Sequence, residues 1–403
     1  MPKFVFLATD IALLMLLAAL AGYVWHVRRS PDLRATWRSV FRDAAAMSAL
    51  VVLGAFILVA ALDSLHFRPL LPPAPGAAAD AQPAYSTRTY SVLDQMLLRQ
   101  LEGTEKTYSA PLAYRSYSKE SMEVDGKPVR DFPRLVHGGA HLGDPATQWL
   151  PDLLRRSAAG LAGGAVAALM LALVVAALHA RAAGGSAGAS WRAIWRRETE
   201  VPLRAVLLTA GALLLLVGWV AAIWGAYHVL GTDRTGNDVL YQALKSIRTA
   251  VVIGSLATLA TLPFAIALGI LAGYFKGWVD DAIQYLYTVL SSIPGVLLIA
   301  AFVLMIQVWI DKNPQLYETG LERADVRLLL LCVILGVTGW ATLCRLLRAE
   351  TLKLSELDFV QAARAFGVAH LRIMRRHIFP NLMHIVLIVA VLDFSALVLY
   401  EAV

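Results

Sequence analysis

The sequence is poor in several features on which soluble proteins and nucleotide-binding proteins depend. Only two of its 403 residues are cysteines, and only 16% of its residues are charged. Cys332 and Cys344 lie in one apolar run, where two residues on one helix at that separation cannot meet, so no disulfide framework is available. No GxxxxGK[ST] phosphate loop occurs, which argues against nucleotide binding by this chain. No convincing repeat of fixed period is present.

Long apolar runs are what the sequence has instead. Hydrophobic residues make up 58% of the chain and the mean hydropathy is +0.61, which is typical of a polytopic membrane protein. A helix needs about 20 apolar residues to cross the hydrocarbon core. The runs are continuous and do not alternate with polar residues, so they predict helices and an all-α fold, not a barrel. Eight spans are expected, at residues 5–25, 44–62, 157–180, 204–227, 247–272, 284–310, 326–347 and 383–400.

The formal net charge of +7 is carried largely by three segments between spans. Residues 26–43 hold five arginines, residues 181–204 hold five more, and residues 345–376 hold seven lysines or arginines. Basic residues collect in short loops on the inner side of a membrane. All three segments fall on that side if the first span, uncleaved, runs from outside to inside. The charge therefore indicates membrane topology and not nucleic-acid binding.

Residues 63–152 are the one long stretch that is not apolar, and the topology places them outside the membrane as a small domain. We expect a hairpin around VDGKPV (124–129) and a short helix in LDQMLLRQLEG that ends at Gly103. His137 and His141 are weak candidates for metal ligands, and a solvated loop is the default interpretation. Residues 153–203 then supply a further span and a basic inner linker.

Residues 355–380 form a basic, patterned segment between two spans, which we call the elbow. Ser355 and Asp358 fit a helix cap, and Phe359, Ala363 and Phe366 recur on one face of the helix that follows. We expect Gly367 to be left-handed, a second helix to start near Val368, and Pro380 to end it. On physical grounds two interpretations are equally open. The elbow either lies on the membrane surface or docks into a groove of a soluble partner.

The elbow's sequence resembles the EAA-type motif of bacterial ABC importer permeases, most of all the second permease of the dipeptide, oligopeptide and nickel family. QAARAFG fits at Ala362, Ala363 and Gly367, and RRHIFPN fits at His377, Ile378 and Pro380. Gln361 stands where the family usually has glutamate. The resemblance implies that this elbow is a coupling helix that docks on an ATPase through Asp358, Phe359, Gln361, Ala362, Ala363, Phe366 and Gly367.

Three further stretches carry the same resemblance, which covers about residues 204–403. HVLGTDRTGNDVL (228–240) resembles the family's external turn, LAGYFKGWVDDAIQ (271–284) an inner turn, and SSIPGVLL (291–298) an IPG or LPG motif. Asn237 or Asp238 should cap the next helix. The family continues beyond the match to YEAV, so one span of a six-span core is expected to be missing. The implied site residues are Gly231, Thr232, Asp233, Gly236 and Asp238 in the external turn, and Pro294 and Gly295 as a candidate hinge.

The resemblance implies a type I ABC importer permease core with an N-terminal extension. The expected parts are an extension with two spans (1–62), an external domain (63–152), a span with its linker (153–203) and the core (204–403). Such a subunit is not an enzyme and holds no cofactor, because ATP and magnesium are bound by partner subunits. Its implied partners in a bacterial inner membrane are a second permease, two ATPases, a periplasmic binding protein that delivers peptides or similar solutes, and membrane lipid, but no nucleic acid.

Two other classes of function remain open from the sequence. A secondary transporter would need ionisable groups near the membrane midplane, where Asp393 is the clearest carboxylate and has no obvious partner. Asp10 lies in the first span but outside the resembling core. A multi-span sensor or scaffold would use residues 63–152 as its ligand domain.

Overall fold

The computed structural model describes residues 3–71, 85–124, 127–317 and 319–400. It divides into two compact units. Unit 1 comprises Met1–Met15, His66–Thr89 and Thr249–Val403, and unit 2 comprises Leu16–Leu65 and Tyr90–Arg248. The elbow therefore belongs to unit 1, whereas the turn at residues 228–240 belongs to unit 2.

Eight helices in the described part of the chain are long and apolar enough to cross a membrane, and they match the eight expected spans. The sixth expected span, 284–310, is nevertheless wrong as a single helix. Helix α10 (Gly277–Ser292) and helix α11 (Gly295–Lys312) are separated by Ile293 and Pro294, whose ψ angles of 129° and 121° are not helical. The remaining spans are α1 (Ala8–Arg29), α3 (Ala44–Asp63), α6 (Pro145–Ala183), α8 (Leu203–Trp224), α9 (Val239–Phe275), α12 (Gly320–Ser355) and the run His370–Leu399.

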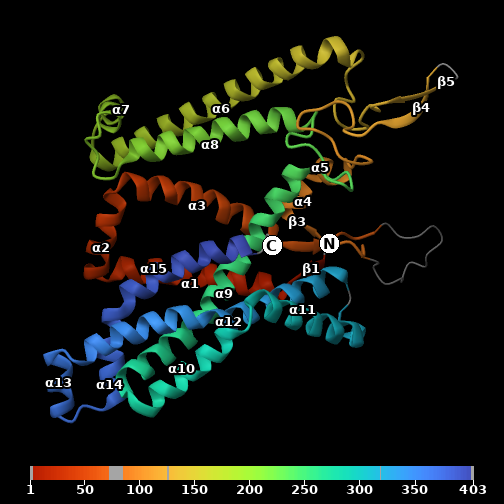
Figure 1. Ribbon diagram of the computed structural model, residues 1–403. Coiled ribbons are helices and arrows are strands. Elements are labelled where there is room, and N and C mark those ends of the chain that lie inside the picture. The colour runs from red at the N-terminus through yellow and green to blue at the C-terminus, as the bar shows by residue number, and fades with distance from the viewer. Residues whose placement is uncertain (1–2, 72–84, 125–126, 318, 401–403) are drawn as a thin grey trace, which may run out of the picture. The chain divides into compact units, whose positions relative to one another are not determined.

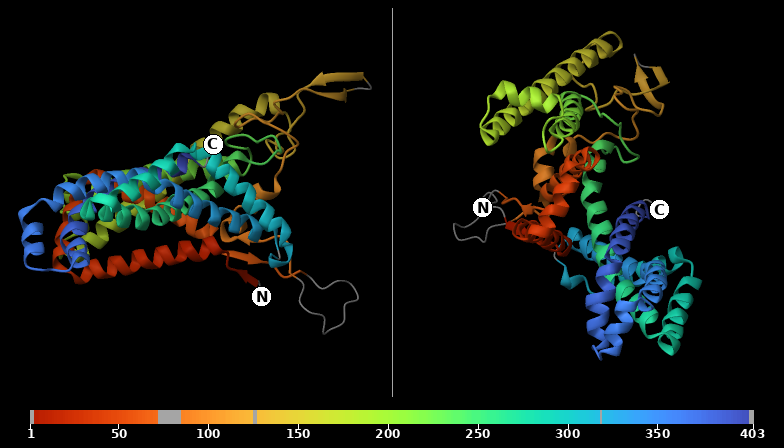
Figure 2. Two further views of the ribbon diagram at one scale, coloured as in Figure 1. Left: turned by 60° about the horizontal axis from the view of Figure 1, so that its bottom comes forward. Right: turned by 90° about the vertical axis from the view of Figure 1, so that its left-hand side faces the viewer.

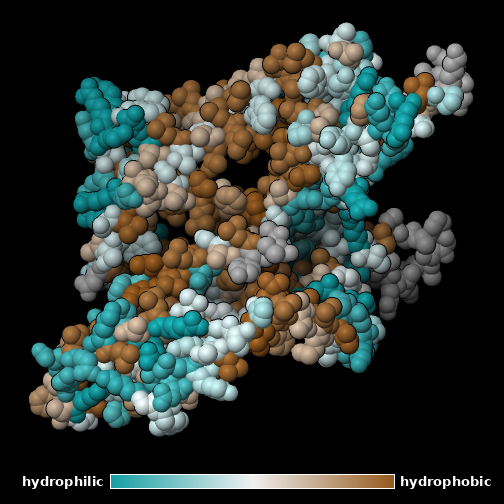
Figure 3. Space-filling model, viewed as in Figure 1, coloured by the Kyte–Doolittle hydropathy of each residue, from teal (hydrophilic) through white to brown (hydrophobic). Residues whose placement is uncertain are grey.

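In unit 2, α6 and α8 lie side by side as a helical hairpin whose end carries α7 (Ala187–Trp195) (Figure 1). Glycines let the two backbones approach closely. A Cβ atom added at Gly160 would lie 2.6 Å from the carbonyl oxygen of Gly218, and one added at Gly164 would lie 2.7 Å from that of Leu214. Figure 3 shows hydrophobic atoms over the middle of this hairpin and hydrophilic atoms at the α7 end, as expected for membrane helices.

The remaining elements of unit 2 are short. The expected hairpin is confirmed, because β4 (Glu120–Val124) pairs antiparallel with β5 (Lys127–Asp131), and it projects beyond the ends of α6 and α8 (Figure 2). Residues 125–126 of its turn lie outside the described residues. The expected short helix is interrupted at Leu97 and ends at Gly103, giving α4 (Val92–Met96) and α5 (Leu98–Glu102). Unit 2 also holds α2 (Pro31–Arg42) and β3 (Tyr90–Ser91).

Unit 1 is organised around α12. Its buried residues Trp340, Leu343 and Leu347 form the centre of a core to which the elbow contributes Val360 and Ile373. At the start of the chain, β1 (Lys3–Val5) pairs antiparallel with β2 (His66–Arg68). The other elements are η1 (Pro314–Leu316), α13 (Asp358–Ala365), α14 (His370–Ile373), the π-helical turn η2 (Met374–Ile378) and α15 (Phe379–Tyr400).

The close approach of α6 and α8 predicts different outcomes for two neighbouring glycine substitutions. Gly164→Ala should destabilise the purified chain by about 1–3 kcal/mol because the new methyl group is forced against the α8 backbone. Gly163→Ala is the matched control, because a Cβ at Gly163 has no atom within 4 Å and alanine favours a helix. Thermal unfolding in detergent measures both. Equal effects of the two substitutions would contradict the packing of this hairpin.

Candidate functional site

The elbow begins where α12 ends, and its first helix starts differently from the expectation. The predicted Ser355 cap is wrong. Ser355 is the last residue of α12, is buried, and donates its hydroxyl to the carbonyl of Leu352 at 2.8 Å. Leu357 precedes α13 in an extended conformation and provides no side-chain cap, and Asp358 is the acidic residue of the first turn. The chain therefore turns sharply between two helices without a capping box.

Helix α13 is anchored on one face and open on the other. Val360 is completely buried in the core of unit 1, whereas Phe366 is 86% exposed and Phe359 is 45% exposed. The exposed side also carries Asp358, Gln361, Ala362 and Gly367, and Ala363 is half-buried. Gly367 follows the helix with φ of 71°, the left-handed conformation expected of it. The result is a short helix that presents small and aromatic side chains to its surroundings.

The second half of the elbow does not end at Pro380, so that expectation is wrong. Helix α14 begins at His370, passes into the π-helical turn η2, and continues as α15, with Pro380 in the first turn of α15. Proline normally breaks a helix because it lacks an N–H and collides with the carbonyl four residues earlier. The wider π turn relieves this conflict, and the Asn381 amide donates to the carbonyl of His377 at 2.6 Å. His377 is half-buried and Ile378 is completely buried.

Tyr274, at the end of α9, ties the elbow to unit 1 from the other side. Its hydroxyl lies 2.9 Å from Nδ1 of His370 and accepts from Nε of Arg364 at 3.3 Å. The Arg364 guanidinium also lies 4.3 Å from the centre of the Tyr274 ring. Two residues on, Lys276 forms an ion pair with Glu356, which lies between α12 and α13. The stretch 271–284 therefore holds both ends of α13, a role that its sequence alone did not reveal.

The turn at residues 228–240 is a compact loop that leads into α9. Asp233 accepts backbone N–H bonds from Thr235 and Asn237, both at 2.9 Å, and a bond from the Gln242 amide at 2.7 Å. Slight burial alone would raise the pKa of Asp233, but these bonds outweigh it and lower the pKa to about 2. Thr232 is buried and donates to the carbonyl of Thr107 at 2.8 Å. The carboxylate is therefore committed to the loop itself.

Asp238 has two roles, one for each carboxylate oxygen. Its Oδ1 accepts the backbone N–H of Tyr241 at 3.0 Å and so caps α9, which decides between the two cap candidates in favour of Asp238. Its Oδ2 lies 2.7 Å from Nδ1 of His228 and accepts from the Trp224 indole at 3.0 Å. The turn is therefore held at both of its ends by one side chain.

His228 is buried between two carboxylates. Its Nε2 lies 3.3 Å from Oε1 of Glu105. The Glu105 carboxylate also accepts three backbone N–H groups: those of His137 and Gly138 at Oε1, at 2.7 and 2.9 Å, and that of Val136 at Oε2, at 2.7 Å. Burial alone would lower the pKa of His228, but Asp238 and Glu105 raise it to about 9. Burial would likewise raise the pKa of Glu105, yet His228 and the amides lower it to about 2. We call Glu105, His228 and Asp238 the triad.

The glycines of the turn make room for the segment that carries Glu105. A Cβ at Gly236 would lie 1.8 Å from the carbonyl oxygen of Glu105, and one at Gly231 would lie 2.3 Å from that of Ser109. Gly236 also has φ of 81°, which side chains rarely adopt. Residues 90–152 and the turn are therefore one folded piece. In the sequence His228 is only the first residue of the stretch HVLGTDRTGNDVL, and no local pattern singles out Glu105.

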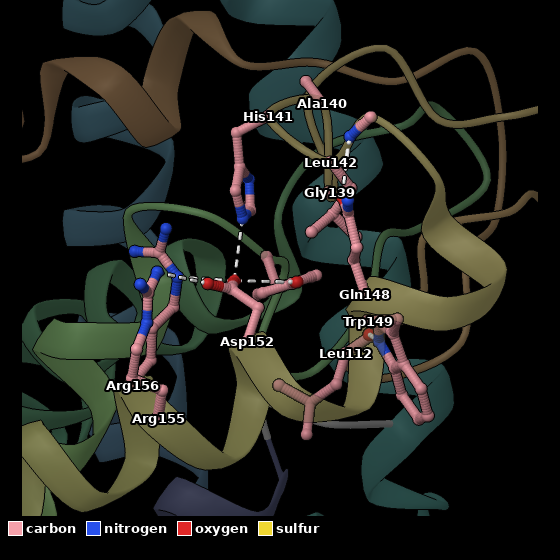
Figure 4. A network of polar contacts seen from close by, with 12 residues as sticks. Leu112, Gly139, Ala140, His141, Leu142, Gln148, Trp149, Asp152, Arg155 and Arg156 are labelled. Carbon is pink, nitrogen blue, oxygen red and sulfur yellow. Dashed lines mark hydrogen bonds and ion pairs between the residues drawn. The ribbon is translucent and has the colours of Figure 1, made fainter.

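A second polar network explains His141, one of the two weak metal candidates. Asp152 of α6 lies 2.7 Å from Nε2 of His141 and accepts from Arg155, Arg156 and the Tyr227 hydroxyl at 2.8, 2.7 and 3.1 Å (Figure 4). Burial and the neighbouring Asp152 raise the pKa of Tyr227 to about 12, so its hydroxyl remains a donor. His137 lines a different pocket, beside Gly103 and His228. Across the described residues no group of three or more His, Cys, Asp or Glu side chains is placed to hold a metal.

Comparison with known proteins finds similarity in the C-terminal part of the chain. Residues 265–403 match the family described as "Binding-protein-dependent transport system inner membrane component". The chain is 30% identical over 177 residues to the oligopeptide transport system permease protein OppC of Mycobacterium tuberculosis strain H37Rv, covering 44% of this chain and 55% of that protein. It is 29% identical to the dipeptide transport system permease protein DppC of Alkalihalophilus pseudofirmus, covering 44% of this chain and 52% of that protein. It is 30% identical to the glutathione transport system permease protein GsiD of Pectobacterium atrosepticum, covering 38% of this chain and 45% of that protein.

The chain spans about half the length of the curated relatives that it matches. The eight apolar helices found in the described residues define a multi-pass, helical membrane protein, and the matched segment is similar to the membrane components of binding-protein-dependent transport systems. Residues 265–403 are similar to the inner membrane components of binding-protein-dependent transport systems, and the relatives named above are permease proteins of peptide and glutathione transport systems. The match includes the whole elbow and the stretch 271–284, whereas the turn at 228–240 lies before the family match.

The triad predicts a stability that depends on pH. The pKa of His228 is raised from 6.5 to about 9, so its contribution is complete below about pH 6.5 and is lost as the pH rises through 9. Stability of the purified chain should therefore fall between pH 6.5 and 9.5, by on the order of 2–3 kcal/mol. His228→Gln should be less stable at pH 6.5 and should remove most of that fall.

Unfolding midpoints measured across this range check the prediction, with His384→Gln, on an exposed site of α15, as the control. The pKa of Glu105 is lowered from 4.5 to about 2, so its share is present above about pH 4.5 and does not confuse the alkaline range. A fall of equal size in wild type and His228→Gln would show that other groups cause it.

Proposed function

We propose that this chain is the membrane permease subunit of an ATP-driven importer for peptides or similar small solutes. The observation that carries the proposal is the geometry of α13. Val360 fixes the helix to the core, while Phe366 beside Gly367 stands 86% exposed. A helix that is held on one face and presents an aromatic side chain on the other suits docking into a groove of a soluble partner.

The partner of α13 is an ATPase subunit in this proposal. The segment that contains α13 lies inside the match to binding-protein-dependent permeases, and the chain has no phosphate loop of its own. ATP and magnesium would therefore be bound by two ATPase subunits. A second permease would complete the path through a bacterial inner membrane. A periplasmic binding protein would deliver the solute to the face that carries the turn at 228–240.

Force would pass from α13 to the membrane helices through direct contacts. Arg364 and His370 bind Tyr274 at the end of α9, and Glu356 pairs with Lys276 just after it. Asp280 of α10, a few residues after Lys276, accepts from Arg348 of α12, whose Nε and Nη2 donate at 2.5 and 2.6 Å. A displacement of α13 would therefore be applied to α9, α10 and α12 together. The break at Ile293 and Pro294 separates α10 from α11 and would allow them to move independently.

The secondary-transporter alternative receives little support from the placement of buried polar groups. Asp10 pairs with Nδ1 of His66 at 2.8 Å, and the backbone N–H of Thr9 donates to Asp325 at 3.0 Å. Thr9 and Asp10 lie in the first turn of α1, His66 lies in β2, and Asp325 lies in the second turn of α12, so neither pair is at mid-helix. Ion-coupled transporters place such groups near the membrane midplane. These pairs are better explained as anchors for the ends of spans.

Docking through α13 predicts a specific loss of the partner. Phe366→Ala should reduce the amount of ATPase that co-purifies with the chain by at least about tenfold, because truncation of a central aromatic anchor typically costs 2 kcal/mol or more. Tyr117→Ala is the matched control, since Tyr117 is a similarly exposed aromatic residue, 73% exposed, that lies within residues 90–152 and not in the elbow. Pull-down from membranes that contain the whole transporter measures the loss. Equal recovery of ATPase with both variants would refute docking by this helix.

The β4–β5 hairpin provides a separate test of the outer face. Replacing residues 120–131 with a short Gly-Ser linker leaves the triad and the turn in place. If the hairpin helps to receive a binding protein, uptake of a labelled peptide should fall several-fold while ATPase co-purification stays unchanged. Unchanged uptake at normal expression would remove this role from the hairpin.

A further inference from the structure

Unit 2 contains a cavity of about 630 Å³ where α1 ends, α2 crosses, α3 begins and the chain approaches α8. Its lining combines two kinds of side chain. Four arginines line it, and so do two aromatic residues of α2. These residues are Arg28, Arg34, Arg38, Arg42, Trp37 and Phe41. None of them lies in the segment that matches the permease family.

The described side chains of the lining carry a net positive charge. Among them Glu200 is the one carboxylate, and it pairs with Arg38 at 2.8 Å and more loosely with Arg42 at 3.8 Å. In the described part of the chain no carboxylate forms an ion pair with Arg28 or Arg34, and Arg34 instead donates to the backbone carbonyl of Arg28. Among the described lining residues four guanidinium groups accompany a single carboxylate, so the cavity suits an anion.

The apolar half of the lining argues against a free ion as the occupant. Trp37 stacks near Phe41, with ring centres 5.8 Å apart, and its indole donates to the Tyr23 hydroxyl at 3.2 Å. Along α2 the apolar residues Leu33, Trp37 and Val40 recur at helical spacing, with arginines between them. Met47 of α3 and Val27 of α1 complete the apolar wall. A ligand that satisfies the whole cavity has an anionic group and a hydrocarbon part.

The position of α2 selects the class of ligand. It connects the ends of two candidate membrane spans, α1 and α3, and it is short, amphipathic and rich in arginine. Such helices lie in the interface between headgroups and acyl chains, where tryptophan is also favoured. We infer that this cavity binds an anionic phospholipid of the phosphatidylglycerol type. Its phosphate is held by Arg28 and Arg34, and its acyl chain lies along Phe41 and Met47.

The test uses the purified full chain in neutral detergent and intact-complex mass spectrometry. Phosphatidylglycerol and phosphatidylcholine with identical acyl chains are added separately. Wild type should retain phosphatidylglycerol at concentrations at which phosphatidylcholine is lost. The double variant Arg28→Gln, Arg34→Gln should bind phosphatidylglycerol at least about tenfold more weakly, because it removes the electrostatic attraction of two arginines to the lipid phosphate. Arg192→Gln, Arg197→Gln removes the same charge from exposed positions at α7 and should bind like wild type.

Three results would overturn the inference. One is equal binding of the two lipids by wild type, and another is an equal loss in both double variants, which would indicate general surface charge. The third is displacement of phosphatidylglycerol by the same concentration of inorganic phosphate, which would show that the arginines recognise a free anion. The first and third use the unaltered chain and therefore do not depend on how a variant folds. The inference is also independent of docking by α13.

Discussion

The carboxylate of Asp238 is the constraint on which unit 2 depends. One oxygen caps α9 and the other holds His228, which in turn meets Glu105. Glu105 gathers three successive backbone amides, so a single chain of contacts fixes the start of a membrane span, the turn before it and a loop more than 100 residues earlier. Removing any member would leave a buried charge or amide without its partner, which is costly away from water. The segment around Glu105 is therefore tied to the turn that leads into α9.

The elbow is likewise held by a small number of contacts, near the other end of α9. Helix α13 has only eight residues, too few to be stable in isolation. Val360 in the core and the pair Arg364 and Tyr274 hold it in place. This arrangement leaves the opposite face available without exposing the backbone of the spans. A short rigid helix on strong anchors is suited to transmit a displacement, because it has little internal freedom in which to dissipate it.

Much of the fold follows from local sequence. The parts that do not follow from it have a physical cause in common. The spans were predictable because about 20 apolar residues in a row have few alternatives to a membrane helix, and Gly367 was predictable because only a left-handed residue makes that turn. The triad was not predictable, because Glu105 and His228 are 123 residues apart and neither sits in a distinctive local pattern. The prediction that Pro380 ends the helix was wrong because it assumed α-helical hydrogen bonding, whereas η2 is a π-helical turn. The break at Ile293 was hidden by the continuous hydrophobicity around it.

The contacts around Gln361 explain why glutamine stands where the resembling motif usually has glutamate. The position resembles one that usually holds glutamate, yet here the side-chain amide donates to the backbone carbonyl of Glu356 at 3.0 Å. An ionised glutamate could not donate that bond and would place a second negative charge beside Glu356. Glu356 already pairs with Lys276, so the negative charge of this corner is supplied one turn earlier in the chain. The substitution therefore keeps the charge balance of the elbow and adds a bond across the bend between α12 and α13, where no side-chain cap is present.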